Sequence, residues 1–207
     1  MASKLLQTLI DRAGASMRDH AEELTKLDSA IGDGDHGVNM ARGFDAITEQ
    51  RDDLAALPVG QALQKAGMTL VMKVGGASGP LYGSLLMATG KAWKQDATTC
   101  ADVAAALEEG IQAVMKRGKS QAGEKTMLDV LVPVNQALAD ADGGFDGPVA
   151  ETLRTTADQA LASTKPMFAT KGRASFLGER SIGHLDPGAR SSALLVHAVL
   201  DALEDCS

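Results

Sequence analysis

The sequence predicts an all-α fold, an antiparallel bundle of about eight helices, and three observations support this prediction. Apolar residues recur every three or four positions over most of the chain, which is the spacing of one helical face. Period-two alternation of β-branched residues is nowhere sustained, so strands are not expected. The connections between the periodic segments are short, which favours antiparallel neighbours. A length of 207 residues without repeats or a low-complexity linker indicates one domain, residues 1–207.

Eight apolar stripes define the predicted helices. The first follows Ser3, a candidate N-cap, and the third follows Pro58, because proline is tolerated in a first helical turn. The fifth is expected to end at Gly118, Pro133 is expected to kink the sixth or shift its start, and the seventh follows Pro148. In chain order the stripes cover residues 6–24, 40–47, 59–70, 81–92, 103–114, 128–138, 153–161 and 194–203.

Two connections between the stripes are distinctive. Residues 140–147 are rich in turn-forming residues and are expected to be a loop between helices. Residues 170–188 contain several glycines, two arginines and a proline, without helical periodicity. An irregular loop of that length inside a compact domain is usually functional or disordered. We therefore expect the second connection to carry function.

Composition excludes several classes of protein. The formal net charge is -7 and there is no block of lysine or arginine, so no nucleic-acid partner is expected. No stretch has the length and apolarity of a membrane span, so no membrane partner is expected either. Cys100 and Cys206 are too few for a disulfide framework. Together with the absence of a recognisable secretory signal, they favour a cytoplasmic protein.

A metal site is predicted near the start of the chain. Asp28 precedes the run Ile31–Asn39, in which Asp33 and Asp35 are separated by glycine. Hard divalent cations such as Mg²⁺ prefer a few carboxylates, with phosphate oxygens completing the shell. The spacing Gly-x-Gly-x-x-Gly in this run is not a dinucleotide fingerprint, because a helical segment precedes it. No glutamate occupies the last position of an EF-hand loop. A solvated acidic helix cap remains the alternative.

Two further segments have the composition of phosphate-binding elements. Gly75–Pro80 places glycines before a predicted helix, so that free backbone N–H groups and a helix N-terminus can cradle an anion. Lys171–Ser181 contains arginines, which can bind phosphate, between glycines that permit closure over a ligand. The alternatives are a tight turn and a solvated surface loop, respectively. Together the three segments indicate a Mg²⁺-dependent nucleotide or polyphosphate site at one end of the bundle.

These motifs resemble the nucleotide-binding L subunits of dihydroxyacetone kinases over essentially the whole chain. The resemblance rests on Asp28 and on residues 31–37, 75–80, 171–175 and 184–188, in the family's order and spacing. It implies an eight-helix up-and-down barrel with the nucleotide, ADP or ATP, at one end. It also implies that three aspartates hold two Mg²⁺ ions that bridge the nucleotide phosphates, namely Asp28, Asp33 and Asp35.

The resemblance implies further roles for individual residues. Arg173 is expected to be catalytic, because an arginine can stabilise charge on a transferring phosphoryl group. The positions that match nucleotide-contacting residues of the family are His36, Gly37, Val38, Asn39, Ala77, Ser78, Gly118, Met127, Arg173, Asp186, Pro187 and Gly188.

Members of this family occur in two designs, either fused to a substrate-binding K domain or as a separate subunit with ADP as a coenzyme. The end of the sequence at Ser207 favours the second design. The expected partners are then a K subunit that holds dihydroxyacetone and a phosphotransferase-system protein that rephosphorylates the ADP. Three alternatives remain open: an ATP-dependent kinase subunit for a related ketose such as erythrulose, a fatty-acid kinase domain, and a non-catalytic metal-binding helical module.

Overall fold

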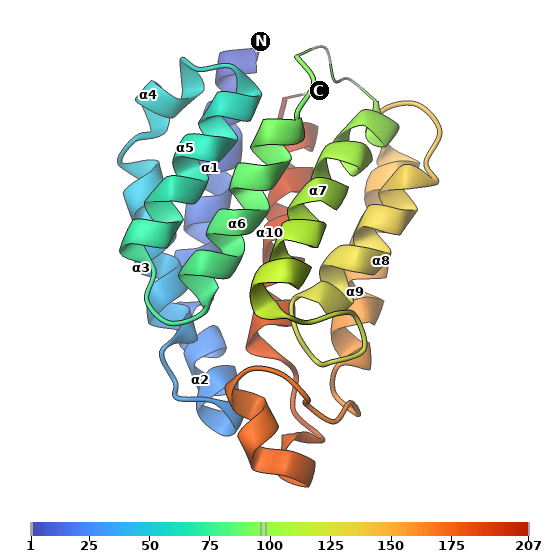
Figure 1. The fold of residues 1–207 in the computed structure, drawn as a ribbon. Helices are drawn as coiled ribbons and strands as arrows, with labels where there is room; N and C mark the ends of the chain where they lie inside the picture. The colour runs from blue at the N-terminus through green and yellow to red at the C-terminus, as the bar shows by residue number, and fades with distance from the viewer. Residues whose placement is uncertain (1, 96, 98, 207) are drawn as a thin grey trace.

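The computed structural model describes residues 2–95, 97 and 99–206, and every regular element in these residues is helical (Figure 1). The predicted all-α class is therefore confirmed. None of the helices in the described ranges is long and apolar enough to span a membrane. The elements are α1 (Ala2–Asp19), α2 (Ala21–Ile31), α3 (His36–Thr48), α4 (Arg51–Ala55), α5 (Val59–Lys73), α6 (Ser78–Ala92), α7 (Cys100–Gly118), α8 (Leu128–Ala139), α9 (Gly147–Ser163), the 3₁₀ helix η1 (Arg173–Ser181) and α10 (Pro187–Glu204).

Eight of these helices form a closed ring. Around the ring each packs on the next in the order α1, α3, α5, α6, α7, α8, α9, α10 and back to α1. Neighbours run in opposite directions, with both chain termini at the upper end in Figure 1. This is the up-and-down barrel that the resemblance implies, and it agrees with the antiparallel bundle expected from the apolar periodicity. The short helices α2 and α4 extend the ring, and α2 and η1 lie together at the lower end.

The interior of the ring is filled by apolar side chains in two clusters. One lies mainly among α1 to α8 and includes Leu24, Met40, Leu70 and Leu128. The other lies among α7 to α10 and includes Leu153. Burial of such side chains stabilises the fold by about 1.5–3 kcal/mol each, so the ring is a rigid support for the residues at its ends.

Helices α5 and α6 approach each other more closely than ordinary side chains permit. Glycines seven residues apart on each helix pair across the antiparallel contact, Gly60 with Gly90 and Gly67 with Gly83. A Cβ atom at Gly67 would lie 2.7 Å from the carbonyl oxygen of Gly83. Backbone contact of this kind fixes the height of α6 against α5, and hence the position of the N-terminus of α6.

Several predicted boundaries are wrong. Ser3 is inside α1 and is not an N-cap, since the helix already includes Ala2. The first apolar stripe corresponds to two helices, α1 and α2, which are separated at His20. The apolar spacing continues across this break, so the spacing does not reveal it. The predicted irregular connection 170–188 contains η1 and the start of α10. A 3₁₀ helix has three residues per turn, so a search for a 3.6-residue period does not detect it.

Other local predictions agree with the structure. Helix α7 ends at Gly118, although the left-handed residue after it is Lys119, with φ of 48°. Helix α8 begins at Leu128, where its stripe begins, so Pro133 lies inside the helix and does not shift its start. The segment between α8 and α9 is a loop. Helix α4 was not predicted, because five residues are too few to show a period.

Candidate nucleotide and metal site

Four helices of the ring begin at the lower end of the barrel in Figure 1, beside one cavity of about 160 Å³. Helices α3, α6, α8 and α10 contribute residues at or next to their N-termini: His36, Ser78, Met127 and Pro187. The N-terminal end of a helix carries a partial positive charge and unpaired N–H groups. Four such ends at one cavity make it favourable for an anionic ligand.

Three aspartates line the same cavity. Asp28, near the end of α2, is buried, whereas Asp33 and Asp35 are exposed on the link to α3. Each aspartate offers one oxygen within 4.8 Å of the others. Within the described part of the chain, no lysine or arginine forms an ion pair with Asp28 or Asp35. Three adjacent carboxylates without enough neutralising charge fit a hard divalent cation such as Mg²⁺.

The buried aspartate also organises the loop that carries the other two. Oδ2 of Asp28 accepts hydrogen bonds from the backbone N–H of Asp35 at 2.9 Å and of His36 at 3.1 Å. Gly34, with φ of 75°, lets the link turn sharply between the two exposed aspartates. Asp28 therefore places the loop with one oxygen, and its other oxygen remains for a metal ion.

Close contact between α2 and α3 keeps these carboxylates together, and it depends on Gly37. A Cβ atom at this position would overlap the carbonyl oxygen of Ala21. It would also lie 2.5 Å from Oγ1 and 2.7 Å from the backbone nitrogen of Thr25. The structure thus explains this glycine by helix packing, independently of any contact with phosphate.

His36 connects three of the converging helices. Its Nδ1 lies 2.9 Å from Oγ of Ser78 on α6, and its Nε2 lies 2.9 Å from Oγ of Ser191 on α10. Burial lowers the pKa of His36, although Asp28 and Asp35 oppose that shift. The imidazole is therefore neutral at physiological pH.

Hydrogen bonds around Ser191 assign the tautomer of this imidazole. The single proton of the Ser191 hydroxyl is shared between the carbonyl oxygens of Pro187 and Gly188, both at 3.1 Å. It must then accept from Nε2–H of His36, so Nδ1 is the acceptor for the Ser78 hydroxyl. Tyr82, whose pKa burial raises to about 12, also lies 2.8 Å from Ser191. This network fixes the relative positions of α3, α6 and α10 at the cavity.

The segment that contains η1 forms one wall of the cavity and brings an arginine to the aspartates. Nη2 of Arg173 lies 2.9 Å from Oδ2 of Asp33, and its side chain is 65% exposed. Buried Ala174 packs with Ile31 and Ala169, which holds the start of η1 against α2. The guanidinium is therefore accessible to a ligand in the cavity, while the start of η1 is packed against α2.

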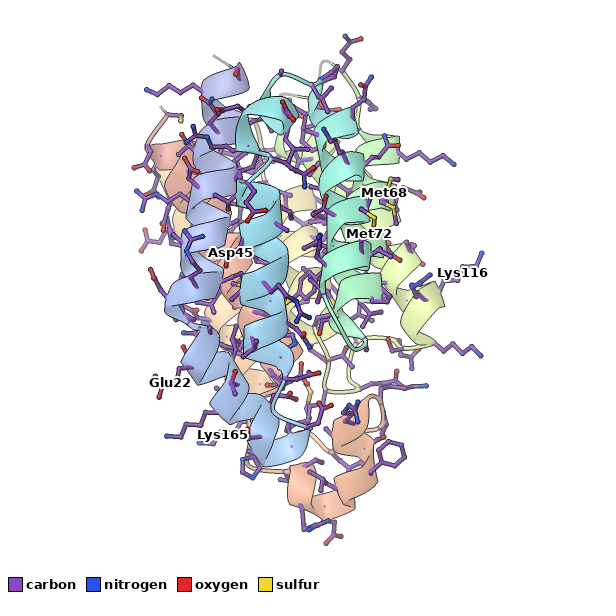
Figure 2. The ribbon with its side chains drawn as sticks, turned by 90° about the vertical axis from the view of Figure 1, so that its left-hand side faces the viewer. Glu22, Asp45, Met68, Met72, Lys116 and Lys165 are labelled. Carbon is purple, nitrogen blue, oxygen red and sulfur yellow. The ribbon has the colours of Figure 1, made fainter. Side chains whose placement is uncertain are left out.

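A second, larger hollow of about 790 Å³ adjoins the cavity between α6 and α7. The two share a common boundary, and the larger hollow extends to Gly118 at the end of α7 and to Lys116, which projects from α7 in Figure 2. A ligand with an anionic end and a larger organic end matches this shape, with the anionic part beside the aspartates. The residues at the shared boundary are Ala77, Leu81, Thr126, Lys171 and Gly172.

Most of the residues that the sequence assigned to the site do lie at these two hollows. The cavity is lined by Asp28, Asp33, Asp35, His36, Ala77, Ser78, Met127, Arg173, Asp186, Pro187 and Gly188, and the larger hollow by Gly118.

Three of the predicted nucleotide positions line neither hollow. Gly37 packs on α2, as described above. Val38 is 59% exposed on α3, and Asn39 is buried with Oδ1 accepting from Nη2 of Arg42 at 2.6 Å. The resemblance to the family assigns these positions to the nucleotide, but successive helical residues point in different directions.

Sequence reasoning missed several residues at the cavity. Lys125 and Thr126 line it from the segment before α8, and Tyr82 lines it from α6. Lys125 is the least expected, since a lysine is almost never fully buried unless paired. No periodic signal identifies it, and its position two residues before Met127 is the only hint in the sequence.

Comparison with known proteins agrees with this geometry. A family model described as the DAK2 domain matches residues 30–201. The chain belongs to the DAK2 domain family. A relative from Listeria innocua serovar 6a, named PEP-dependent dihydroxyacetone kinase 1, ADP-binding subunit DhaL, is 47% identical to this DAK2 domain over 187 residues, which cover 90% of each chain. The subunit of the same type from Escherichia coli is 41% identical over 95% of each chain.

Solved structures extend the likeness to three dimensions. The dihydroxyacetone kinase from C. freundii, solved in complex with AMP-PNP and Mg²⁺, superposes with a TM-score of 0.74 at 25% identity. The match covers 98% of this DAK2 domain and 34% of that longer chain. The all-helical barrel is therefore shared with part of a protein that was crystallised with a nucleotide analogue and magnesium.

Proposed function

We propose that this DAK2 domain is the Mg-ADP-binding subunit of a multi-subunit dihydroxyacetone kinase. In this proposal it passes a phosphoryl group to dihydroxyacetone held on a separate K subunit, and a phosphotransferase-system protein then rephosphorylates the bound ADP. The observation that carries the proposal is the meeting of three carboxylates, four helix N-termini and Arg173 at one cavity. The names of the relatives support the acceptor and the coenzyme.

The chain's own residues have distinct tasks in this function. Asp28, Asp33 and Asp35 would hold Mg²⁺, in our proposal two ions, which neutralise phosphate charge and orient the phosphates. The N-terminus of α6 faces the phosphates with its free N–H groups, whereas α10 is already capped by Asp186, which accepts from the N–H of Ala189. The hydroxyl of Ser78 is engaged by His36, which holds this residue at the start of α6.

Arg173 is the group that we assign to the transfer step. Phosphoryl transfer requires stabilisation of charge on the equatorial oxygens more than covalent chemistry by the protein, and an arginine at that position contributes about 10³–10⁵ in rate. The guanidinium already lies at the aspartates through its contact with Asp33. His36 is neutral and engaged at both ring nitrogens, so we assign the base for the acceptor hydroxyl to the partner subunit.

The longer relatives favour one second candidate. The L-erythrulose 1-kinase of Mycolicibacterium smegmatis is 36% identical over 87% of this chain, which matches 32% of that protein. Since the acceptor in our proposal is held by another subunit, the same nucleotide site is compatible with a related ketose. A function of either kind, with a phosphotransferase-system donor, would place the protein in the cytoplasm.

The nucleotide carried by the purified protein tests the proposal. The protein is denatured, with and without prior EDTA treatment, and the supernatant is separated by anion-exchange chromatography. We expect near-stoichiometric ADP that survives gel filtration and is lost with the chelator. An empty protein that exchanges ATP freely would instead favour an ATP-dependent kinase. No binding of either nucleotide at any Mg²⁺ concentration would favour a non-catalytic module and refute the proposal.

A further inference from the structure

Lys125 is a buried charged residue to which the proposed function gives no task. Only 1% of its surface is exposed, and its backbone has φ of 61°, in the left-handed region. A lysine tolerates that conformation only where the surroundings determine it. Burying an ammonium is also costly unless its donors are satisfied. The cost of burying this ammonium and of its left-handed backbone must therefore be offset by interactions with its surroundings.

The ammonium group binds backbone carbonyl oxygens from two separate segments. Nζ donates to the carbonyl oxygens of Thr164 at 2.8 Å, Met167 at 3.1 Å and His184 at 2.6 Å, with that of Lys165 at the limit of 3.5 Å. An ammonium has three protons and no lone pair. Three close acceptors therefore use all of its donors, and none is left for a phosphate.

The two segments are the two ends of the wall that carries Arg173. Residues 164–167 leave α9 and His184 precedes α10, so the chain between them, residues 168–183, starts and finishes at Lys125. The same closure is reinforced by the N–H of Gly183, which donates to the carbonyl oxygen of Lys165 at 2.8 Å. Lys125 thus binds both ends of this segment at one point, beside the direct bond between Gly183 and Lys165.

The contacts of Lys125 require its protonated state. Burial lowers the pKa of Lys125, and Asp186, the buried N-cap of α10, opposes that shift. Its surroundings are otherwise carbonyl oxygens, which only a donor can satisfy. A neutral amine would leave a lone pair facing those oxygens, so the geometry fits the ammonium form.

We propose that Lys125 is a positioning residue: its ammonium joins the two ends of residues 168–183 and thereby holds Arg173 at the aspartates. It acts through the backbone and touches neither the nucleotide nor the metal. This inference rests on the proposed function for its kinetic consequence, but the structural consequence can be measured without turnover.

The test compares Lys125→Met, which removes the ammonium and keeps an unbranched apolar side chain, with wild type in the full chain. Hydrogen exchange followed by mass spectrometry should be at least about tenfold faster in residues 168–183, because their tether is lost. Exchange in α5 and α6 should be unchanged. Mn²⁺ binding, measured by electron paramagnetic resonance, should change less than about twofold, since the aspartates lie on α2 and its link.

A double-mutant cycle with Arg173→Ala separates positioning from general destabilisation. If Lys125 acts through Arg173, Lys125→Met should lower kcat about a hundredfold alone and cause no further loss in the Arg173→Ala background. Additive losses, or unchanged exchange in residues 168–183, would overturn the inference. If no transfer is seen even in wild type, the proposed function fails, while the exchange result still decides the tether. Lys125→Gln, which keeps two donors on a shorter side chain, serves if the methionine variant does not fold.

Discussion

Substituting Gly37 by alanine should separate α2 from α3 and weaken the metal site, although it removes no functional group. The new Cβ would lie 2.7 Å from the backbone nitrogen of Thr25, and the closest ordinary contact is 3.4 Å. Helix α3 must therefore retreat by about 0.7 Å from that atom, and further from the carbonyl oxygen of Ala21. Both obstacles are backbone atoms of a helix, so a change of rotamer cannot relieve the overlap.

The energetic cost follows from two opposing terms. Overpacking of this kind costs about 1–3 kcal/mol, and the rigid backbone partners place Gly37 at the upper end. Alanine regains about 1 kcal/mol of helix propensity over glycine. We therefore expect a net loss of about 2 kcal/mol in the free energy of unfolding. The bonds from Asp28 to the N–H groups of Asp35 and His36 would lengthen, so Mg²⁺ affinity should fall at least about tenfold.

Urea unfolding followed by circular dichroism measures the stability, and titration with Mn²⁺ measures the metal site. Gly147→Ala is the matched control, because a Cβ there meets nothing within 4 Å and α9 begins at the opposite end of the barrel. That control should change stability by no more than about 0.5 kcal/mol. A Gly37→Ala variant with wild-type stability and wild-type Mn²⁺ affinity would refute the packing argument.

Three other variants test separate parts of the structure. Arg173→Ala should leave ADP affinity within about threefold and lower phosphoryl transfer about 10³-fold; full activity in the reconstituted assay would remove its role. Gly67→Ala should lower stability by about 1–2 kcal/mol, because its Cβ meets the carbonyl oxygen of Gly83, and an unchanged urea midpoint would contradict this. Burial raises the pKa of Asp186 to about 7, so the folded protein binds more protons than the unfolded chain between about pH 4 and 7. Its contribution to stability should fall by about 2–3 kcal/mol from pH 5 to 8, and Asp186→Asn should remove that dependence in urea unfolding.

The helical ring could be predicted from the sequence because each helix is marked by apolar residues that recur at helical spacing within a short segment. Stripes such as Leu128 to Leu138 reveal both the helix and its buried face. The aspartate cluster was also predictable, since Asp28 and Asp33 are close in sequence and share one chemistry. For both features, a short segment of the sequence determines the local structure.

The remaining features depend on contacts between distant segments. Lys125 is buried by residues about 40 and 60 positions further along the chain, so nothing near it in the sequence indicates its surroundings. The pairing of Gly67 with Gly83 requires the register of two helices. Val38 and Asn39 are nucleotide positions by the resemblance to the family, but neither lines the two hollows, because successive side chains on α3 point in different directions.

The most direct test of the central claim is calorimetric titration of ADP into nucleotide-free protein, with and without Mg²⁺, for wild type, Asp33→Asn and Asp45→Asn. Asp45 is the control, because it is an aspartate on α3 that does not line the cavity (Figure 2). Its side chain is partly exposed and forms an ion pair with Arg18. We expect ADP binding that requires Mg²⁺ in wild type and Asp45→Asn and is lost in Asp33→Asn. Equal Mg²⁺-dependent binding in all three proteins would place the nucleotide site elsewhere.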